Sequence, residues 1–547
     1  MTNPPQSGSD EEQITLQATY APVVEVNSPL LQGGFLGAFE ASLASDDALP
    51  TQSRTYLPGD ELNEAEGHFA AGVRYALGEG VGQDWTAAGR HIRNAAEQGH
   101  SQAQLFLGDM CSEGRGVKKD RAAACRWYRR AASAGNVYAQ NNLGASYAAG
   151  CGVPQDYTKA ERWFRKAAAQ DHAKAQYNLG LLYAEGLGVQ RDEREAALWF
   201  RRAGEQGHAI AQCRLGVQYA VGRGLERNLE QACEWLRRAA ERGQLHAQLC
   251  LGILHAEGGS QVANYEEAAK WFRLAADQGD GEARFRLGLM HLEGDGMPAD
   301  HREAAKWYGK AAESGNAKAQ NNLALMFEEG LGVDRNQREA LRLFALAAEQ
   351  GHAMAQLRLG GMYFLGHGLP QSDEEAAKWY RKAADQGNSY AQYNLGFMCA
   401  SGRGVAQDFK QAVAWYRRAA ADDVAEAQSA LGDMFAAGLG VARNDSEAAE
   451  WYRLAAEHGY PHAQVRLGDM FATGRGVPQD DSEALRWHAE ADESRATWDD
   501  SDVIVLGFTP YENEDERDAC IASKRLRELV FSPMVASRTR SSERPLD

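Results

Sequence analysis

Glycine-rich loops and regularly spaced histidines are the first residues in this sequence that suggest chemistry. Loops of the form Gly-x-Gly-Val, such as 186–189, would cradle phosphate if each followed a strand and opened a helix of a βαβ unit. Here they follow helical patterns and recur along the chain, so we interpret them as turns. Four histidines lie about 36 residues, or a multiple of 36, apart: His100, His172, His208 and His352. This spacing keeps them from converging on one metal ion, so we interpret them as turn residues.

Eight cysteines are the other candidate reactive groups. No pair forms Cys-x-x-Cys, and the spacing is irregular, whereas a disulfide framework or zinc site would recur at fixed offsets. We expect reduced, mostly buried thiols, with Cys111 and Cys125 the pair most able to meet. Neither His-Glu-x-x-His nor Ser-x-x-Lys occurs. The sequence therefore predicts no catalytic residue, no metal ligand and no cofactor. The cysteines are Cys111, Cys125, Cys151, Cys213, Cys233, Cys250, Cys399 and Cys520.

Length and charge limit the classes of protein that fit this sequence. A chain of 547 residues exceeds what one compact core supports, so it must divide into domains or repeat. A net charge of −18 argues against binding to a phosphate backbone, and hence against nucleic acid. No stretch approaches the ~20 apolar residues of a membrane helix, and the first residues lack a basic start followed by an apolar run. We expect no membrane insertion and a cytoplasmic protein.

A 36-residue period organises the elements that carry these residues. Leu-Gly pairs recur in one register, with Gly72 ahead of them and Ala324 in place of one glycine; we call this glycine position the marker. Twelve units fill 61–492. The pairs are Leu107-Gly108, Leu143-Gly144, Leu179-Gly180, Leu215-Gly216, Leu251-Gly252, Leu287-Gly288, Leu359-Gly360, Leu395-Gly396, Leu431-Gly432 and Leu467-Gly468.

Each unit contains the residues that end and begin two helices. A glycine six residues after the marker, such as Gly186, ends the first helix. Twelve residues after the marker stands Asp, Asn or Ser, as at Asp192, a strong N-cap for the second helix, and Glu or Gln often follows three residues later, as in a capping box. Ten units carry a tryptophan nineteen residues after the marker, as at Trp199, and most second helices stop at a glycine. Because one hairpin cannot bury its apolar face alone, the hairpins must stack.

The pattern resembles the Sel-1-like repeat, a 36-residue relative of the tetratricopeptide repeat. The segments Ala175–Asp192 and Ala196–Gly207 match it, with Gly204 in place of one alanine. The resemblance implies an all-α fold, an α/α solenoid (superhelix) of twelve helix-turn-helix repeats, and a non-catalytic scaffold or adaptor that binds a protein segment.

Two alternatives from other classes stay open. One is a regulatory or virulence-type factor, exported without a classical signal, that engages a foreign protein. The other is β-lactam binding or hydrolysis, which the resemblance implies for a cysteine-rich secreted branch; this sequence lacks that branch's regular cysteines.

The flanks differ from the array. Residues 1–60 hold eight acidic residues and one basic residue, and we predict that they are mostly disordered. Residues 493–531 are predicted to form a linker and a capping helix, since solenoids need atypical ends. We predict that residues 532–547 are disordered.

The most specific prediction concerns the partner-binding surface. In the tetratricopeptide architecture the first helices line the inner wall, so residues three before and one after the marker should share one exposed face. In the middle units these residues are mostly apolar, while Asp109, Asp433 and Asp469 stand at the second site in outer units. Such a groove would suit a partner segment with apolar anchors and basic flanks. The predicted anchors are Tyr177, Leu181, Leu249, Ile253, Phe285, Leu289, Leu325, Leu357, Tyr393 and Phe397.

Overall fold

The structure, a computed structural model, describes residues 64–257 and 263–495. All regular elements in these ranges are helices, 24 in number, and no strand occurs there. The predicted N-terminal segment 1–60 and tail 532–547 lie outside the described residues, as does the predicted linker and cap 493–531 except for the end of the last helix.

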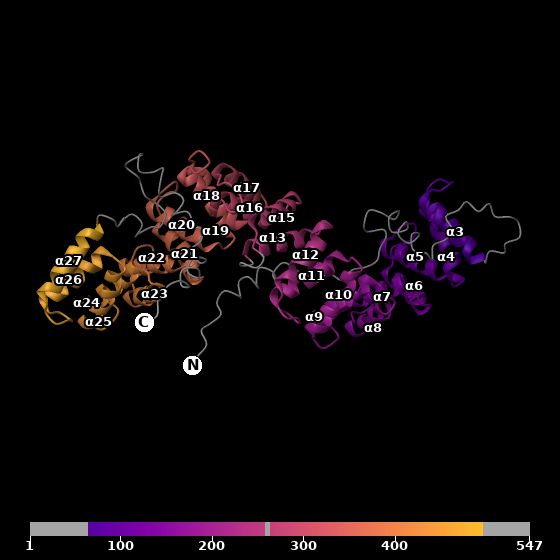
Figure 1. Ribbon diagram of the computed structural model, residues 1–547, viewed down its shortest axis with the longest axis horizontal. Helices are drawn as coiled ribbons and strands as arrows, with labels where there is room; N and C mark the ends of the chain where they lie inside the picture. The colour runs from indigo at the N-terminus through magenta and orange to yellow at the C-terminus, as the bar shows by residue number, and fades with distance from the viewer. Residues whose placement is uncertain (1–63, 258–262, 496–547) are drawn as a thin grey trace. The chain divides into compact units, whose positions relative to one another are not determined.

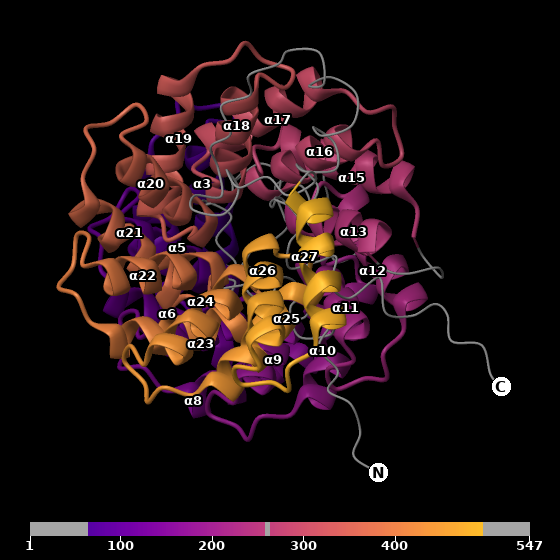
Figure 2. The same cartoon turned by 90° about the vertical axis from the view of Figure 1, so that its left-hand side faces the viewer.

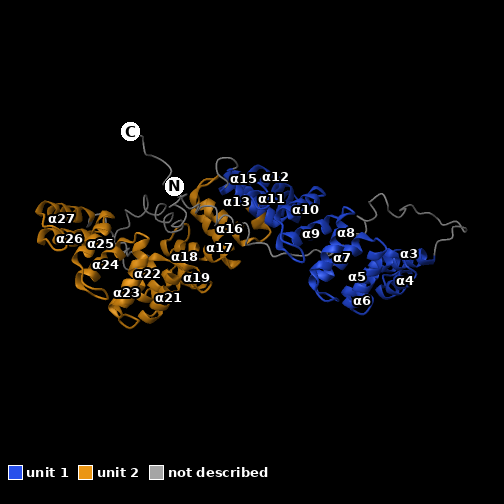
Figure 3. Cartoon of the chain, turned by 90° about the horizontal axis from the view of Figure 1, so that it is seen from below, with its two compact units in different colours: residues 1–271 blue, residues 272–547 orange. Residues whose placement is uncertain are grey.

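The chain divides into two compact units, residues 1–271 and 272–547 (Figure 3). In the first unit each helix packs on the next along the chain, so successive hairpins lie side by side (Figure 1). Its helices are α3 (Glu64–Leu77), α4 (Trp85–Glu97), α5 (Ser101–Glu113), α6 (Arg121–Ser133), α7 (Val137–Ala149), α8 (Tyr157–Ala168), α9 (Ala173–Glu185), α10 (Glu193–Glu205), α11 (Ala209–Val221), α12 (Leu229–Glu241), α13 (Leu245–Glu257) and the start of α15 (Tyr265–Asp277).

The second unit repeats this arrangement, and Figure 2 shows its last hairpins, from α22 to α27, next to one another. After the end of α15 its helices are α16 (Gly281–Glu293), α17 (His301–Glu313), α18 (Ala317–Glu329), α19 (Gln337–Glu349), α20 (Ala353–Leu365), α21 (Asp373–Asp385), α22 (Ser389–Ser401), α23 (Phe409–Ala421), α24 (Ala425–Ala437), α25 (Asp445–Glu457), α26 (Pro461–Thr473) and α27 (Asp481–Arg495). The predicted array of helical hairpins is confirmed.

The helices end and begin at the predicted glycine and N-cap residues. The first helices end at glycines in the left-handed conformation, such as Gly186 with φ 69°. Asp171 and Asp423, which stand where other second helices end at glycine, adopt positive φ values of 56° and 59°. The N-cap of every second helix accepts a backbone N–H bond through its side chain, as Asp192 does from the amides of Arg194 and Glu195.

Half of the predicted capping box is wrong, because the N-cap amide does not bond to the side chain three residues later. A capping box returns the N-cap amide to the side chain three residues later. Here the Asp192 amide donates to the Tyr183 carbonyl of the first helix at 2.9 Å, and the same backbone bond recurs at the other second-helix caps. Some of the glutamates pair with side chains one turn later instead, as Glu339 does with Arg342 at 2.5 Å. The bond ties the two helices of a hairpin together.

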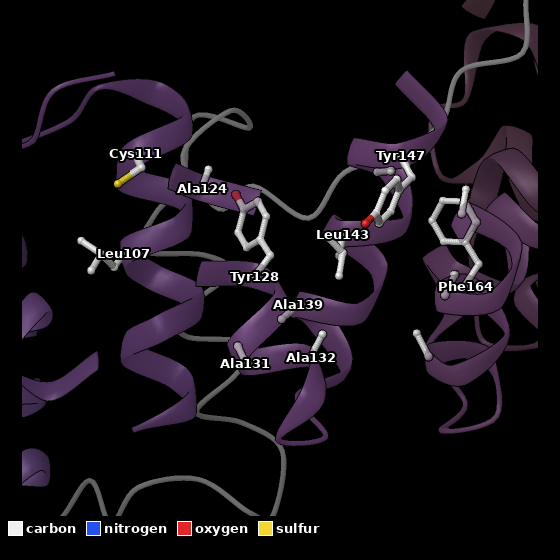
Figure 4. Close-up of a cluster of buried hydrophobic side chains, with 14 of the residues drawn as sticks. Leu107, Cys111, Ala124, Tyr128, Ala131, Ala132, Ala139, Leu143, Tyr147 and Phe164 are labelled. Carbon is white, nitrogen blue, oxygen red and sulfur yellow. The ribbon is translucent and has the colours of Figure 1, made fainter. Parts of the chain in front are cut away.

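The marker glycines allow the two helices to approach closely. A Cβ on Gly108 would lie 2.5 Å from the Tyr128 ring, and one on Gly180 would lie 2.7 Å from the Phe200 ring. Each ring lies in the interior, and Figure 4 shows Leu107, Tyr128, Leu143 and Phe164 across successive helices of one hydrophobic cluster. The absent side chain therefore makes room for the ring twenty residues later.

Glutamine side chains tie neighbouring repeats together. Gln356 in α20 donates to the Ala348 carbonyl at the end of α19 at 3.0 Å and accepts from Gln386 at 2.7 Å. Gln140, Gln176 and Gln320 occupy the same position and make the same two bonds. Because these groups are buried or half-buried, the bonds satisfy polar atoms that packing would otherwise leave unpaired.

Candidate partner-binding face

The structure buries most of the residues predicted to line the groove. Leu289, Tyr393 and Phe397 keep partial exposure. The other seven are packed in the interior: Tyr177, Leu181, Leu249, Ile253, Phe285, Leu325 and Leu357. These seven side chains pack in the interior. The prediction that they form an exposed stripe, three residues before and one residue after the marker, is therefore wrong.

Contacts with the neighbouring repeat explain the burial. The Tyr177 ring stacks on His208 of the next repeat with centroids 4.9 Å apart. Phe285 lies 5.8 Å from the Tyr308 ring, and the ammonium of Lys318 in the next repeat lies 5.9 Å above its own ring. In these two repeats the site three residues before the marker is thus turned toward neighbouring side chains instead of toward solvent, whereas Tyr393 at the same site keeps partial exposure.

The face that does open follows a different register. Four partly exposed residues of α11 are Ile210, Arg214, Val217 and Val221, whose spacing of four, three and four defines one side of a helix; Ala209 and Tyr219 are partly exposed outside this spacing. These stand six and two residues before and one and five residues after the marker, and we call these four positions the open face. All four are at least partly exposed in α11, α16, α24 and α26, whereas the two central positions are buried in α7, α9, α13, α18 and α20. Of the two sites predicted to line the groove, only the second belongs to it.

The prediction that Asp109 makes one end of the groove acidic is also wrong. Asp109 is 2% exposed, and the Tyr128 hydroxyl donates to its carboxyl at 2.7 Å. Burial raises the pKa of Asp109 to about 8, so the group is mainly uncharged at neutral pH. At the other end, Asp433 and Asp469 are more open, with side-chain nitrogens of Arg466 and His488 at 3.7 Å and 3.2 Å. The acidic character is confined to that end.

A group of partly exposed apolar side chains lies on α20 and α22 in the second unit. Tyr393 and Phe397 on α22 are partly exposed, and Met354 and Leu365 lie at the two ends of α20. The Phe397 ring meets Phe364 of α20 edge-on, with centroids 6.2 Å apart. We call Met354, Leu365, Tyr393 and Phe397 the aromatic patch.

Acidic side chains border this patch on the next first helix, α24. Glu426 and Asp433 act electrostatically on Tyr393, whose pKa is raised, chiefly by burial and then by neighbours that include these two groups. Glu426 is itself half-buried, and burial raises its pKa. An apolar surface therefore adjoins carboxylates within one unit.

The spaced histidines have a role that the sequence analysis missed. His352 Nδ1 accepts from the Ala355 amide at 3.3 Å, and His100, His172 and His208 make the same bond. They are N-caps of first helices. Burial lowers the pKa of His172 and His352 to about 4, which keeps the capping nitrogen unprotonated near neutral pH.

The remaining candidates for chemistry have structural roles. The second glycine of most loops approaches the preceding repeat: a Cβ on Gly116 would lie 2.0 Å from the Trp85 carbonyl oxygen, although one on Gly80 would meet no atom within 4 Å. Six of the seven described cysteines are buried, all seven are free thiols, and Cys520 lies outside the described residues. Within 64–257 and 263–495 no group of three His, Cys, Asp or Glu side chains is placed to hold a metal. No described helix combines the length and apolar character needed to cross a bilayer.

Comparison with known proteins now adds the family. The Sel1 repeat model matches twelve consecutive segments from 65–100 to 461–491, and the chain belongs to the Sel1 repeat family. A crystal structure of a protective antigen from uropathogenic Escherichia coli strains, described as displaying an SLR fold, is 31% identical, with a TM-score of 0.64 over 88% of this chain and 97% of that one. A Sel1 repeat protein from Oxalobacter formigenes is 31% identical over 63% of this chain and 89% of its own, with a TM-score of 0.46. No curated protein matches the chain.

Proposed function

We propose that this protein is a non-catalytic scaffold that holds a segment of a partner protein against its first helices, with the main contacts at the aromatic patch. The observation that carries the proposal is the partial exposure of Tyr393 and Phe397 in an array that buries most other large side chains of its first helices. Repeat solenoids use variable residues on such surfaces for binding.

The chemistry of the patch defines the partner. Rings that already pack on neighbours, such as Phe397 on Phe364, lose little freedom on binding and suit the role of anchors. Glu426 and Asp433 beside the patch favour a segment with Lys or Arg next to its apolar residues. The partner is therefore a helix or extended segment with apolar anchors and basic flanks.

A displayed peptide library selected on the full-length chain tests the proposal. Enriched peptides should combine apolar anchors with Lys or Arg flanks. Leu365→Asp should weaken their binding by about 2 kcal/mol or more, or about 30-fold in Kd. Leu346→Asp is the matched control, because Leu346 has the same 37% exposure as Leu365 but lies on the second helix α19.

Two further variants separate binding from folding. Phe397→Asp should weaken binding with little change in melting temperature, whereas Phe285→Asp should lose several kcal/mol of stability because it buries a charge in packed surroundings. Unchanged peptide binding by folded Leu365→Asp and Phe397→Asp would place the working surface elsewhere.

A further inference from the structure

The last described helix leaves an apolar face uncovered. Leu485 in α27 is 71% exposed, and Ala489, one turn later, is exposed as well. In most earlier repeats the position of Leu485 is buried, as at Val413 and Ala449, and in the others it is only partly exposed, as at Leu341. A loop of the following repeat covers it there: a Cβ on Gly89, the equivalent in the first repeat, would lie 3.0 Å from Val117.

The residues of this face depart from those that receive another repeat. The position of Ala489 holds arginine in nine of the twelve repeats. Arg129 and Arg165 use it to donate to tyrosine hydroxyls of the next repeat, Tyr147 and Tyr183, at 2.8 Å and 2.6 Å. With Leu485 and Ala489 in place, α27 offers an apolar stripe, so the surface favours an apolar occupant over a further repeat with that tyrosine.

Charge surrounds the stripe. Residues 480–493 contain six acidic residues and one basic residue. The basic residue, Arg486, pairs with Glu483 at 2.9 Å and with Glu490 at 3.6 Å. The occupant should therefore combine apolar side chains with positive charge.

The chain itself contains such a segment beyond the described residues. Residues 521–531 read IASKRLRELVF, with three basic residues, one acidic residue and apolar side chains at Leu526, Leu529, Val530 and Phe531. The 25 residues from 496 to 520 would span about 25–30 Å as a flexible linker, which exceeds the ~22 Å length of a 15-residue helix. A tether of this length holds a segment at millimolar effective concentration.

We propose that residues 521–531 dock on the end face formed by Leu485 and Ala489 of α27 in the same molecule. Leu526 and Leu529 would cover the apolar stripe, and Lys524, Arg525 and Arg527 would meet the surrounding carboxylates. The docked segment would close the end of the array against association with a second copy. This surface is separate in sequence from the aromatic patch, so the proposal does not depend on the function proposed above.

Carbodiimide coupling of the full-length protein tests the docking directly, because it joins an amine to a carboxylate in contact with it. Lys524 is the only lysine after Lys410. We expect mass spectrometry of the monomer to show an amide between Lys524 and a carboxylate of 480–493. Leu485→Asp and Leu526→Asp should each lower its yield several-fold, while Leu346→Asp leaves it unchanged.

Two results would overturn the proposal. Coupling of Lys524 to 480–493 found only in covalent dimers would assign the face to a second copy. A yield in the monomer that both aspartate variants leave unchanged, or no coupling to 480–493 at all, would show that the segment does not occupy this face. Hydrogen exchange of α27 provides a second measurement, since Leu526→Asp should speed exchange there if the segment covers it.

Discussion

Replacing the marker glycine Gly180 by alanine tests whether close approach of a ring explains this position. A Cβ at Gly180 would lie 2.7 Å from two atoms of the Phe200 ring and 3.3 Å from the Ala196 carbonyl oxygen. Phe200 is buried and cannot move outward, so the added methyl should cost about 1–3 kcal/mol as overpacking. Alanine also raises helix propensity by about 1 kcal/mol, which leaves a net loss of about 0–2 kcal/mol.

Gly309→Ala provides the matched control. Gly309 lies inside the second helix α17, and a Cβ there meets no atom within 4 Å. The same substitution should therefore stabilise α17 by about 1 kcal/mol through helix propensity alone. Subtracting the two effects cancels the propensity and leaves the packing cost of Gly180.

Native-state hydrogen exchange is the suitable assay, because long repeat arrays depart from two-state unfolding. Amides of α9 and α10 should exchange faster in Gly180→Ala, and amides of α17 should exchange more slowly in Gly309→Ala. Equal stabilisation by both substitutions would refute the close-approach explanation.

The eighth repeat supplies a natural version of the double variant. There Ala324 takes the marker position beside the buried Phe344, and Leu343 replaces the tryptophan. If the smaller residue gives the second helix room to shift, Trp199→Leu should offset part of the cost of Gly180→Ala, with a favourable coupling of about 0.5–3 kcal/mol in a double-mutant cycle. Additive effects would show that the eighth repeat accommodates its alanine in another way.

Two pH-linked predictions follow from buried groups. The raised pKa of Asp109, about 8, means that the folded state holds a proton that the unfolded chain releases above pH 3.8, so stability falls as pH rises from about 4 to 8. Asp109→Asn should remove about 2–3 kcal/mol of that loss between pH 5 and 7, measured by native-state hydrogen exchange of the amides of α5 and α6; an unchanged pH profile would contradict the assignment. The lowered pKa of His352, about 4, has the opposite consequence, since the unfolded chain takes up a proton below pH 6.5 and stability falls as pH drops toward 4. His352→Asn keeps a capping acceptor, as Asn388 does in the next repeat, and should reduce this acid sensitivity by about 1–3 kcal/mol; greater acid sensitivity in the variant would refute the capping role.

The hairpins could be predicted because their ends depend on local chemistry. A glycine at positive φ and an Asp, Asn or Ser that accepts backbone amides act within a few residues, so a single sequence records them. Asp171 and Asp423 show the strength of this local control, since both follow the glycine conformation without being glycine. The reciprocal capping bond was predicted wrongly because its competitor, a carbonyl nine residues earlier, comes from the other helix of the hairpin.

The histidine caps were missed although the sequence contained a signal. Histidine is not among the usual N-cap residues, so the four were interpreted as turn residues. At the same offset stand Asn136, Asn316 and Asn388, which are usual caps and make the same bond to the amide three residues later. Comparing repeats at that offset would have assigned the role.

The binding face was predicted only in part because it depends on the angle between neighbouring first helices. Residues two and three before the marker are adjacent on the helix, and a rotation of one residue's angle decides which of them faces solvent. The structure turns Tyr177 and Phe285 toward the next repeat, and the polar bond from Asn178 to Asn141 of the preceding repeat at 3.0 Å shows how closely these helices approach. The spacing of residues within one repeat does not determine the angle between the first helices of neighbouring repeats.

The residue one position after the marker shows how the array varies its surface without changing its packing. Where this residue is acidic, the second helix supplies a donor: Tyr128 binds Asp109 and Tyr452 binds Asp433, each at 2.7 Å. His488 meets Asp469 in the same way at 3.2 Å.

Where the second helix carries phenylalanine instead, the partner at that position is apolar, as Leu181 is to Phe200. A carboxyl at this position thus stands opposite a second-helix donor, whereas an apolar residue stands opposite either kind of ring, since Leu289 and Phe397 lie in repeats whose second helices carry Tyr308 and Tyr416. Tyrosine on the second helix is therefore compatible with a carboxyl or an apolar side chain one position after the marker, while the caps keep the helix ends in place. Because Tyr416 and Tyr452 occupy the same position on their second helices, one change at the position after the marker suffices to place Phe397 on one first helix and Asp433 on the next.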